Sequence, residues 1–164
     1  MKVAEVMTKA VVVLNPEDAI SIASEKMTSM KVSGAPVVNG NGKLVGILSE
    51  ADILRSMKTS EKSLYLVYPS LSSISVSFRE KITEREAVEA YKEIEKIKVK
   101  DIMTKQVETA KPEDELRSAI KKMVSNGINR LPVVDQENKV IGIVTRGDIL
   151  RGIAAESNNK NNKS

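Results

Sequence analysis

Two short stretches of the sequence combine a hydroxyl group with a carboxylate three residues later. Ser49 precedes Asp52, and Thr145 precedes Asp148, each time where an apolar run meets a helical pattern. A hydroxyl at a helix start can donate to a phosphate oxygen, and the helix dipole and unpaired N–H groups there also favour anions. A carboxylate one turn later can accept both hydroxyl groups of a ribose. The spacing favours nucleotide binding, although the same residues could simply cap their helices.

The two stretches belong to a long internal repeat. VGILSEADILR (45–55) and IGIVTRGDILR (141–151) lie 96 residues apart, and residues 3–57 align with residues 99–153 without a gap. Of these 55 aligned positions 22 are identical, which shared composition alone does not produce. The chain is therefore a tandem duplication, and its two halves should form two copies of one structural unit.

Composition excludes several kinds of chemistry. The 164 residues include no cysteine and no histidine, which removes disulfides, thiolate chemistry and the commonest general base and metal ligand. No paired acid cluster replaces them, so we do not expect an enzyme. The hydrophobic fraction of 41% can supply a core. The abundance of Lys and Glu without cysteine fits a thermophile protein, although mesophile proteins show it too.

The chain shows no sign of a membrane or secretory protein. No apolar run approaches the roughly 20 residues that a membrane span needs. The start, MKVAEVMTKA, lacks the apolar run of a signal peptide. We therefore expect a cytoplasmic protein. The net charge of +4 is a weak attraction toward polyanions, far from a nucleic-acid-binding footprint.

Each repeat predicts the same order of elements. Residues 10–16 form a short β-branched run that predicts a strand, and Asn15 is expected to cap a helix with Pro16 at its first position. Residues 35–49 predict a hairpin around an Asn-Gly turn, and Ser49 is expected to cap a final helix. Between them, apolar residues recur at helical spacing: Ile20, Ala23, Met27 and Met30 in the first repeat, and Leu116, Ala119, Ile120 and Met123 in the second. The predicted fold class is α+β, with two strand-helix-strand-strand-helix units.

The segment between the repeats, residues 58–98, has a different pattern. Thr83 followed by Glu86 predicts a capping box, and an apolar stripe after it predicts a helix over about 84–97. In the first half, ISVSF alternates like a strand, but the serine-rich run around it also fits an ordered loop. The polar tail, residues 154–164, is expected to be disordered.

The repeats resemble the CBS domain, the module named after cystathionine β-synthase. The resemblance rests on VMTKAVVVLNPEDAI and GAPVVNGNGKLVGILSEADIL in the first repeat, and on IMTKQVETAKPEDEL and NRLPVVDQENKVIGIVTRGDIL in the second. It implies one domain over 1–57 and another over 99–153, packed about a pseudo-twofold axis as a Bateman module. Members of this family bind adenosine compounds, namely AMP, ADP, ATP or S-adenosylmethionine, in the two clefts between the repeats.

The resemblance also implies a role for individual residues. The aspartate would hold the ribose, the hydroxyl would hold phosphate, and the apolar residue two positions before the hydroxyl would line the adenine pocket. One cleft would use Asp148, Thr145 and Ile143 with Ala10 and Val11 from the facing repeat; the other would use Asp52, Ser49 and Ile47 with Gln106 and Val107. Arg130 stands just before LPV, where the family often carries a basic residue that reaches phosphate, whereas the first repeat has Gly34 there.

The two clefts are expected to differ because the copies differ beside the hydroxyl. Glu50 follows Ser49, whereas Arg146 follows Thr145. A guanidinium group can grip phosphate, and a carboxylate repels it. The cleft of Asp148 should therefore bind a phosphorylated ligand more tightly. The alternative is that both side chains simply point into solvent.

The leading hypothesis is a stand-alone regulatory module that binds an adenosine compound, signals to a partner protein and forms a homodimer. A nucleic-acid-binding protein, and a structural or dimerisation module with degenerate sites, are the alternatives. The dimer could use the apolar faces around Ile20, Met27, Leu116 and Met123, although core is the default assignment for such residues.

Overall fold

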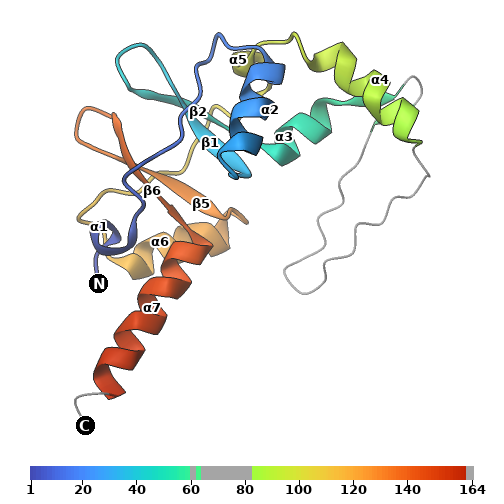
Figure 1. Cartoon of the computed structure of the whole chain (residues 1–164). Helices are drawn as coiled ribbons and strands as arrows, with labels where there is room; N and C mark the ends of the chain where they lie inside the picture. Colours follow the sequence, from blue (N-terminus) through green and yellow to red (C-terminus); the bar gives the residue numbers. More distant parts are fainter. Residues whose placement is uncertain (60–61, 64–82, 162–164) are drawn as a thin grey trace.

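The computed structural model describes residues 1–59, 62–63 and 83–161. The first repeat contains α1 (Val3–Val6), α2 (Ile20–Ser29), β1 (Gly34–Val38), β2 (Leu44–Ser49) and α3 (Glu50–Ser56). The second contains α5 (Val99–Ile102), α6 (Leu116–Ser125), β5 (Arg130–Val134), β6 (Val140–Thr145) and α7 (Arg146–Asn161). Between them lie β3 (Lys58–Thr59), β4 (Lys62–Ser63) and α4 (Glu84–Ile94). The fold class is α+β, as the sequence predicted (Figure 1).

Each repeat is built around one antiparallel hairpin, β1–β2 or β5–β6, and the two hairpins share the same register. Asn39 holds the first turn, because its Oδ1 atom accepts the backbone N–H groups of Asn41 and Lys43. Asp135 holds the second turn through the same pattern of bonds. Asn and Asp side chains both mimic a backbone turn, so the two turns are equivalent in kind.

The core consists of two clusters, and each includes the leading segment of the other repeat. Val3 is fully buried in the cluster of the second repeat, and Val99 is fully buried in that of the first. The N–H of Val3 donates to the carbonyl of Asp114, and that of Val99 to the carbonyl of Asp18, both at 2.9 Å. The leading segments therefore cross over, and each repeat completes the core of its partner.

A pseudo-twofold axis relates the repeats. Lys43 at the tip of the first hairpin forms an antiparallel bridge with Lys139, which is its own equivalent 96 positions later. A residue can contact its own equivalent in this way only at a twofold axis. Figure 1 shows the two hairpins side by side, with α2 and α3 on the side of the first hairpin and α6 and α7 on the side of the second, while α1 and α5 each lie with the opposite repeat.

The first strand of each repeat is much shorter than the sequence predicted. It is reduced to a single parallel bridge, between Leu14 and Val37 in one repeat and between Ala110 and Val133 in the other. A proline follows two residues after each bridge. Because proline has no N–H to donate, the pairing ends there.

Helix α2 begins later than predicted. The side chain of Asn15 closes a local turn by accepting the N–H of Glu17 at 2.9 Å, and the helix starts only at Ile20. Its first N–H groups donate to the carbonyls of Ile97 and Glu95, which follow α4. Backbone groups distant in the sequence thus replace the expected side-chain cap.

The apolar helix faces that were candidates for a dimer interface belong to the core. Ile20, Met27, Leu116 and Met123 are at most 5% exposed. They pack against the hairpin of their own repeat within the two core clusters. Of the two assignments that the sequence left open for these four residues, an interface between chains or core, core is therefore confirmed.

Helix α4 has the predicted capping box. The hydroxyl of Thr83 accepts the N–H of Glu86, and the Glu86 carboxylate accepts the N–H of Thr83. The helix ends at Ile94, three residues before the predicted end, and Ala90 and Ile94 are buried in the core of the first repeat. ISVSF, with its strand and loop alternatives, lies outside the described residues.

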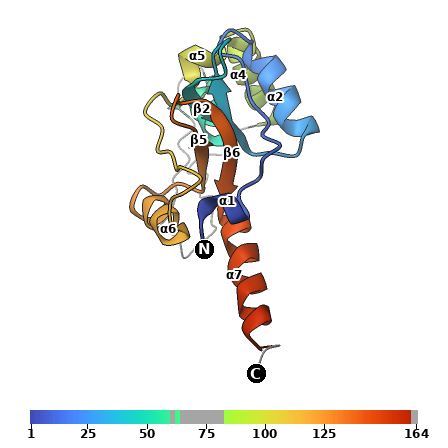
Figure 2. The ribbon, with the colours of Figure 1, turned by 90° about the vertical axis from the view of Figure 1, so that its left-hand side faces the viewer.

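Helix α7 continues past the second repeat to Asn161, so most of the predicted disordered tail is helical. No proline or glycine follows Gly152 to end the helix. Figures 1 and 2 show α7 projecting away from the body of the molecule. Among the described residues, no helix is long and apolar enough to cross a membrane.

Candidate functional site

Asp52 lies at the start of α3 and is 8% exposed. Its Oδ2 atom accepts the backbone N–H of Ser49 at 2.8 Å and the Ser49 hydroxyl at 2.9 Å. Its Oδ1 atom accepts Nη2 of Arg55 at 2.5 Å and faces the hydroxyl of Thr104 at 3.4 Å. The Ser49 hydroxyl in turn accepts the N–H of Asp52 at 3.2 Å. The predicted cap by Ser49 is confirmed, and the candidate ribose carboxylate of Asp52 is its reciprocal partner in the capping box.

Asp148 at the start of α7 is 5% exposed and repeats this arrangement. Its Oδ2 atom accepts the N–H of Thr145 at 2.8 Å and the Thr145 hydroxyl at 2.6 Å. Its Oδ1 atom accepts Nη2 of Arg151 and faces the hydroxyl of Thr8 at 3.4 Å. The two clusters therefore match group by group under the pseudo-twofold relation.

The segment of the other repeat runs along each cluster. The backbone N–H and C=O of Thr104 pair with those of Ile47 on β2, both at 2.9 Å, and Thr8 pairs in the same way with Ile143 on β6. These pairings carry the remaining predicted residues toward the matching cluster: Gln106 and Val107 follow Thr104, and Ala10 and Val11 follow Thr8. The structure therefore brings the segment of Thr104 to Ile47 and that of Thr8 to Ile143, while the roles of Ala10, Val11, Gln106 and Val107 in the clefts stay predictions.

Glycine makes this close approach possible. A Cβ atom on Gly46 would lie 2.4 Å from Sδ of Met103, and one on Gly142 would lie 2.6 Å from Sδ of Met7. Both methionines come from the crossing segment of the other repeat. The glycine of the repeated phrase thus provides the space for another chain segment.

Arg130 reaches across the pseudo-twofold axis. Its Cα atom pairs with that of Thr145 in the β5–β6 hairpin. Its Nη1 atom donates to the carbonyl of Gly34 at 2.7 Å, and its Nη2 atom donates to the hydroxyl of Ser33 at 2.6 Å. Gly34 is itself opposite Ser49. The guanidinium group therefore lies on the side of the first repeat, although its backbone belongs to the second.

The residues that distinguish the two clefts are both exposed. Arg146 donates from Nη2 to the carbonyl of Ile128 at 3.2 Å, and Glu50 lies at the equivalent position in α3. The Arg146 guanidinium is thus turned to the carbonyl of Ile128, and that of Arg130 is directed toward the Ser49 side. The expected difference in phosphate affinity stays a prediction.

Sequence reasoning missed two pairs of residues that contact the carboxylates. These are Thr8 with its equivalent Thr104, and Arg55 with its equivalent Arg151. The signal was present, because both pairs are identical at the 96-residue spacing. What the sequence could not show was that a threonine from one repeat meets an aspartate from the other.

Three ion pairs between side chains tie the leading segments to the opposite repeat. Lys98 and Lys100 donate to Glu17 at 2.5 and 2.7 Å, and these bonds lower the pKa of Glu17 to about 2. Lys2 donates to Glu115 at 2.5 Å, which raises the pKa of Lys2 and lowers that of Glu115. All these groups are exposed, so their contribution to stability is screened by solvent.

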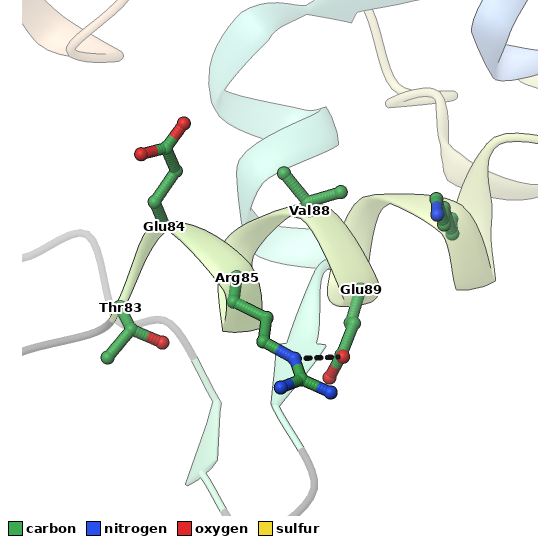
Figure 3. A pocket seen from close by; sticks show the side chains of 6 residues that line it. Thr83, Glu84, Arg85, Val88 and Glu89 are labelled. Carbon is green, nitrogen blue, oxygen red and sulfur yellow. Dashed lines mark hydrogen bonds and ion pairs between the residues drawn. The ribbon is translucent and has the colours of Figure 1, made fainter.

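A surface hollow of about 640 Å³ lies elsewhere, along α4 (Figure 3). It is lined by Thr83, Glu84, Arg85, Val88, Glu89 and Lys92, which all come from α4 and its N-cap. It contains none of the predicted site residues, and a single helix surface does not enclose a ligand. The described residues also include no group of carboxylates arranged to hold a metal ion.

Comparison with known proteins supports the resemblance seen in the sequence. The family model described as "CBS domain" matches residues 3–59 and again residues 99–155. The uncharacterized protein MJ1426 of Methanocaldococcus jannaschii is 42% identical over 154 residues, which are 93% of this chain and 91% of that protein. The inosine-5′-monophosphate dehydrogenase of the same organism is 34% identical over 92% of this chain, but the match spans only 23% of that enzyme.

Solved structures agree with this fold. The CBS-pair protein CBSX2 from Arabidopsis thaliana has a TM-score of 0.75 and 26% identity, with 96% of each chain covered. A structure of CBSX2 in complex with AMP has a TM-score of 0.70 and 25% identity, and it covers 95% of this chain and 98% of that one.

Proposed function

The chain belongs to the CBS-domain family, and on that premise we propose that its two clefts bind adenosine compounds and report their occupancy to a partner protein. The observation that carries this proposal is the duplicated cluster. Asp52 and Asp148 are each nearly buried beside a hydroxyl group, and each faces a segment from the opposite repeat. A ligand bound to such a cluster contacts both repeats at once, so its binding can change how they are held together.

Each cleft has the groups that an adenosine compound requires. The carboxylate of Asp52 or Asp148 accepts ribose hydroxyls, and the neighbouring Ser49 or Thr145 hydroxyl turns its one O–H from the aspartate to the phosphate. Apolar side chains line the adenine. These are Ile47 and Val107 in one cleft, and Ile143 and Val11 in the other, with the backbones of Gln106 and Ala10 beside them.

The ligand we propose first is AMP. CBSX2, which has the same fold over nearly the whole chain, is solved in complex with AMP. ADP, ATP and S-adenosylmethionine share the adenosine group and are the other candidates. Arg146 beside Thr145, and Arg130 directed toward Ser49, favour a ligand that carries phosphate.

We also propose that the protein acts as a homodimer. Because the faces first considered are core, the interface must use other residues. Leu54 on α3 and its equivalent Leu150 on α7 are 41% and 67% exposed. A pair of equivalent exposed leucines suits a twofold interface between chains. Sedimentation analysis of the wild type and of Leu54→Glu with Leu150→Glu tests this, and a monomeric wild type would contradict it.

Calorimetric titration of the whole chain tests the proposed ligand class. AMP, ADP, ATP, S-adenosylmethionine and single-stranded RNA are titrated against wild type, Asp52→Asn and Asp148→Asn. Each substitution should remove tight binding at one cleft, because lost hydrogen bonds to ionised groups cost roughly 1.5–3 kcal/mol, or about 10- to 150-fold in affinity.

Asp135→Asn is the matched control. It also replaces a carboxylate by an amide, but in the distant hairpin turn, where the first repeat already has Asn39 making the same bonds. Binding of RNA but not of adenosine compounds would favour a nucleic-acid-binding protein. Binding of none of them would favour a structural module and contradict the proposal.

A further inference from the structure

The carboxylates of both clefts are already fully hydrogen-bonded. An ionised carboxylate offers about four acceptor positions. In Asp52, Ser49 supplies two donors to Oδ2, and Arg55 and Thr104 supply one each to Oδ1. Asp148 is filled in the same way by Thr145, Arg151 and Thr8. A ribose can therefore donate to either aspartate only if one of these donors leaves.

The donors differ in how easily they leave. The bonds to Oδ2 belong to the helix cap, and losing a cap costs about 1 kcal/mol of stability. The threonine hydroxyls are 3.4 Å from Oδ1, so their bonds are weak. The arginines make the close contact to Oδ1, yet their side chains are half or more exposed, at 50% for Arg55 and 74% for Arg151. A hydroxyl at that distance blocks little of Oδ1, so the arginine is the donor that a ribose must displace, and an exposed guanidinium regains water when it swings away.

We infer that Arg55 and Arg151 occupy the ribose positions of the empty clefts and compete with the ligand for Asp52 and Asp148. This inference rests on the proposed function, because it assigns the ribose to these two carboxylates. Each arginine is three residues after its aspartate on the same helix, so it stays close when displaced. The apparent affinity of each cleft is then the intrinsic affinity multiplied by the fraction of time for which the arginine has left the carboxylate.

The competition has a defined sign and size. Ion pairs between a carboxylate and an exposed cation contribute about 0.2–1 kcal/mol. Replacing the arginine by glutamine should therefore tighten the binding of adenosine by roughly 1.5- to 5-fold in that cleft. Adenosine is the right probe because it is uncharged, so any attraction between the arginine and a phosphate does not enter.

Salt gives a second measurement on the unmodified protein. Added salt screens the ion pairs of the exposed arginines. Raising NaCl from 50 to 500 mM should therefore tighten adenosine binding to the wild type more than to the Arg55→Gln/Arg151→Gln double variant. 2′,3′-Dideoxyadenosine lacks both ribose hydroxyls. It should therefore bind the wild type and the double variant with the same affinity.

The decisive experiment is calorimetric titration of adenosine and AMP into wild type, Arg55→Gln, Arg151→Gln and the double variant. Arg85→Gln is the matched control, because it removes an arginine paired with Glu89 at 3.0 Å on α4, away from the clefts (Figure 3). The inference is supported if only the cleft variants gain affinity for adenosine. Where a variant does not fold, the salt response of the wild type decides. The inference is overturned if added salt tightens the binding of adenosine no more than it tightens the binding of dideoxyadenosine.

Different results would refute the role of the arginines and the proposed function. Unchanged or weaker adenosine binding in the double variant overturns the role of the arginines, while the proposed function stands as long as wild type binds adenosine or AMP. Absence of binding by all ligands in every folded protein overturns the proposed function, and the inference with it.

Discussion

Gly46→Ala tests whether the crossing segments set the shape of the clefts. A Cβ atom at this position would lie 2.4 Å from Sδ and 2.9 Å from Cγ of Met103, and 3.0 Å from the carbonyl oxygen of Thr104. The methionine side chain can move, but the carbonyl is part of the backbone that pairs with Ile47. The substitution should therefore push the crossing segment away from β2, and overpacking of this kind costs about 1–3 kcal/mol.

The equivalent change on the other side should cost less. At Gly142 the new atom would lie 2.6 Å from Sδ of Met7 but 3.4 Å from the carbonyl of Thr8, which is ordinary contact. We expect about 2 kcal/mol for Gly46→Ala and about 1 kcal/mol for Gly142→Ala. In a domain of this size each kcal/mol lowers the Tm by roughly 2–4 °C.

Denaturant unfolding followed by circular dichroism measures both costs. Gly40→Ala is the matched control, because nothing lies within 4 Å of its Cβ position, and its stability should stay within about 0.5 kcal/mol of wild type. The displacement should also move Gln106 and Val107, which follow Thr104, and so weaken ligand binding in that cleft more than in the other. Equal costs at the three glycines, or a larger cost at Gly142, would refute the reasoning.

Three further outcomes are expected. Glu17→Gln should lower the Tm at neutral pH but not near pH 2. Because the pKa of Glu17 is lowered from 4.5 to about 2, the stability that its ionised form contributes is complete above about pH 4.5 and is lost as the pH falls toward 2. A Tm difference that persists in acid would contradict this. Val99→Ala should destabilise the protein by about 2 kcal/mol in urea unfolding, because this fully buried residue completes the core of the opposite repeat. A loss of stability under about 0.5 kcal/mol would contradict the packing of this leading segment in the first repeat. Thr145→Ala should weaken AMP binding more than Ser49→Ala does, since Arg146 favours the phosphate in that cleft, and the reverse order in calorimetry would reject the asymmetry.

The sequence alone was sufficient wherever the interaction is local or repeated. Ser49 caps α3 and pairs with Asp52 because the two are three residues apart, a distance that a helix start always brings together. The hairpins follow from alternating apolar runs and from turn residues such as Asn39. The gapless 96-residue spacing indicated two equivalent units, and the structure relates them by a pseudo-twofold axis.

The tertiary structure decided everything that depends on contacts between distant segments. The start of α2 moved to Ile20 because carbonyls after α4 cap it, and local signals at Asn15 could not reveal them. The exchange of Val3 and Val99 between the cores likewise depends on which repeat the leading segment reaches. Thr104 meets Asp52 only through that exchange. Local spacing fixed which groups each repeat offers, whereas the packing of one repeat against the other fixed which groups meet, because contacts across the axis leave no periodicity in the sequence.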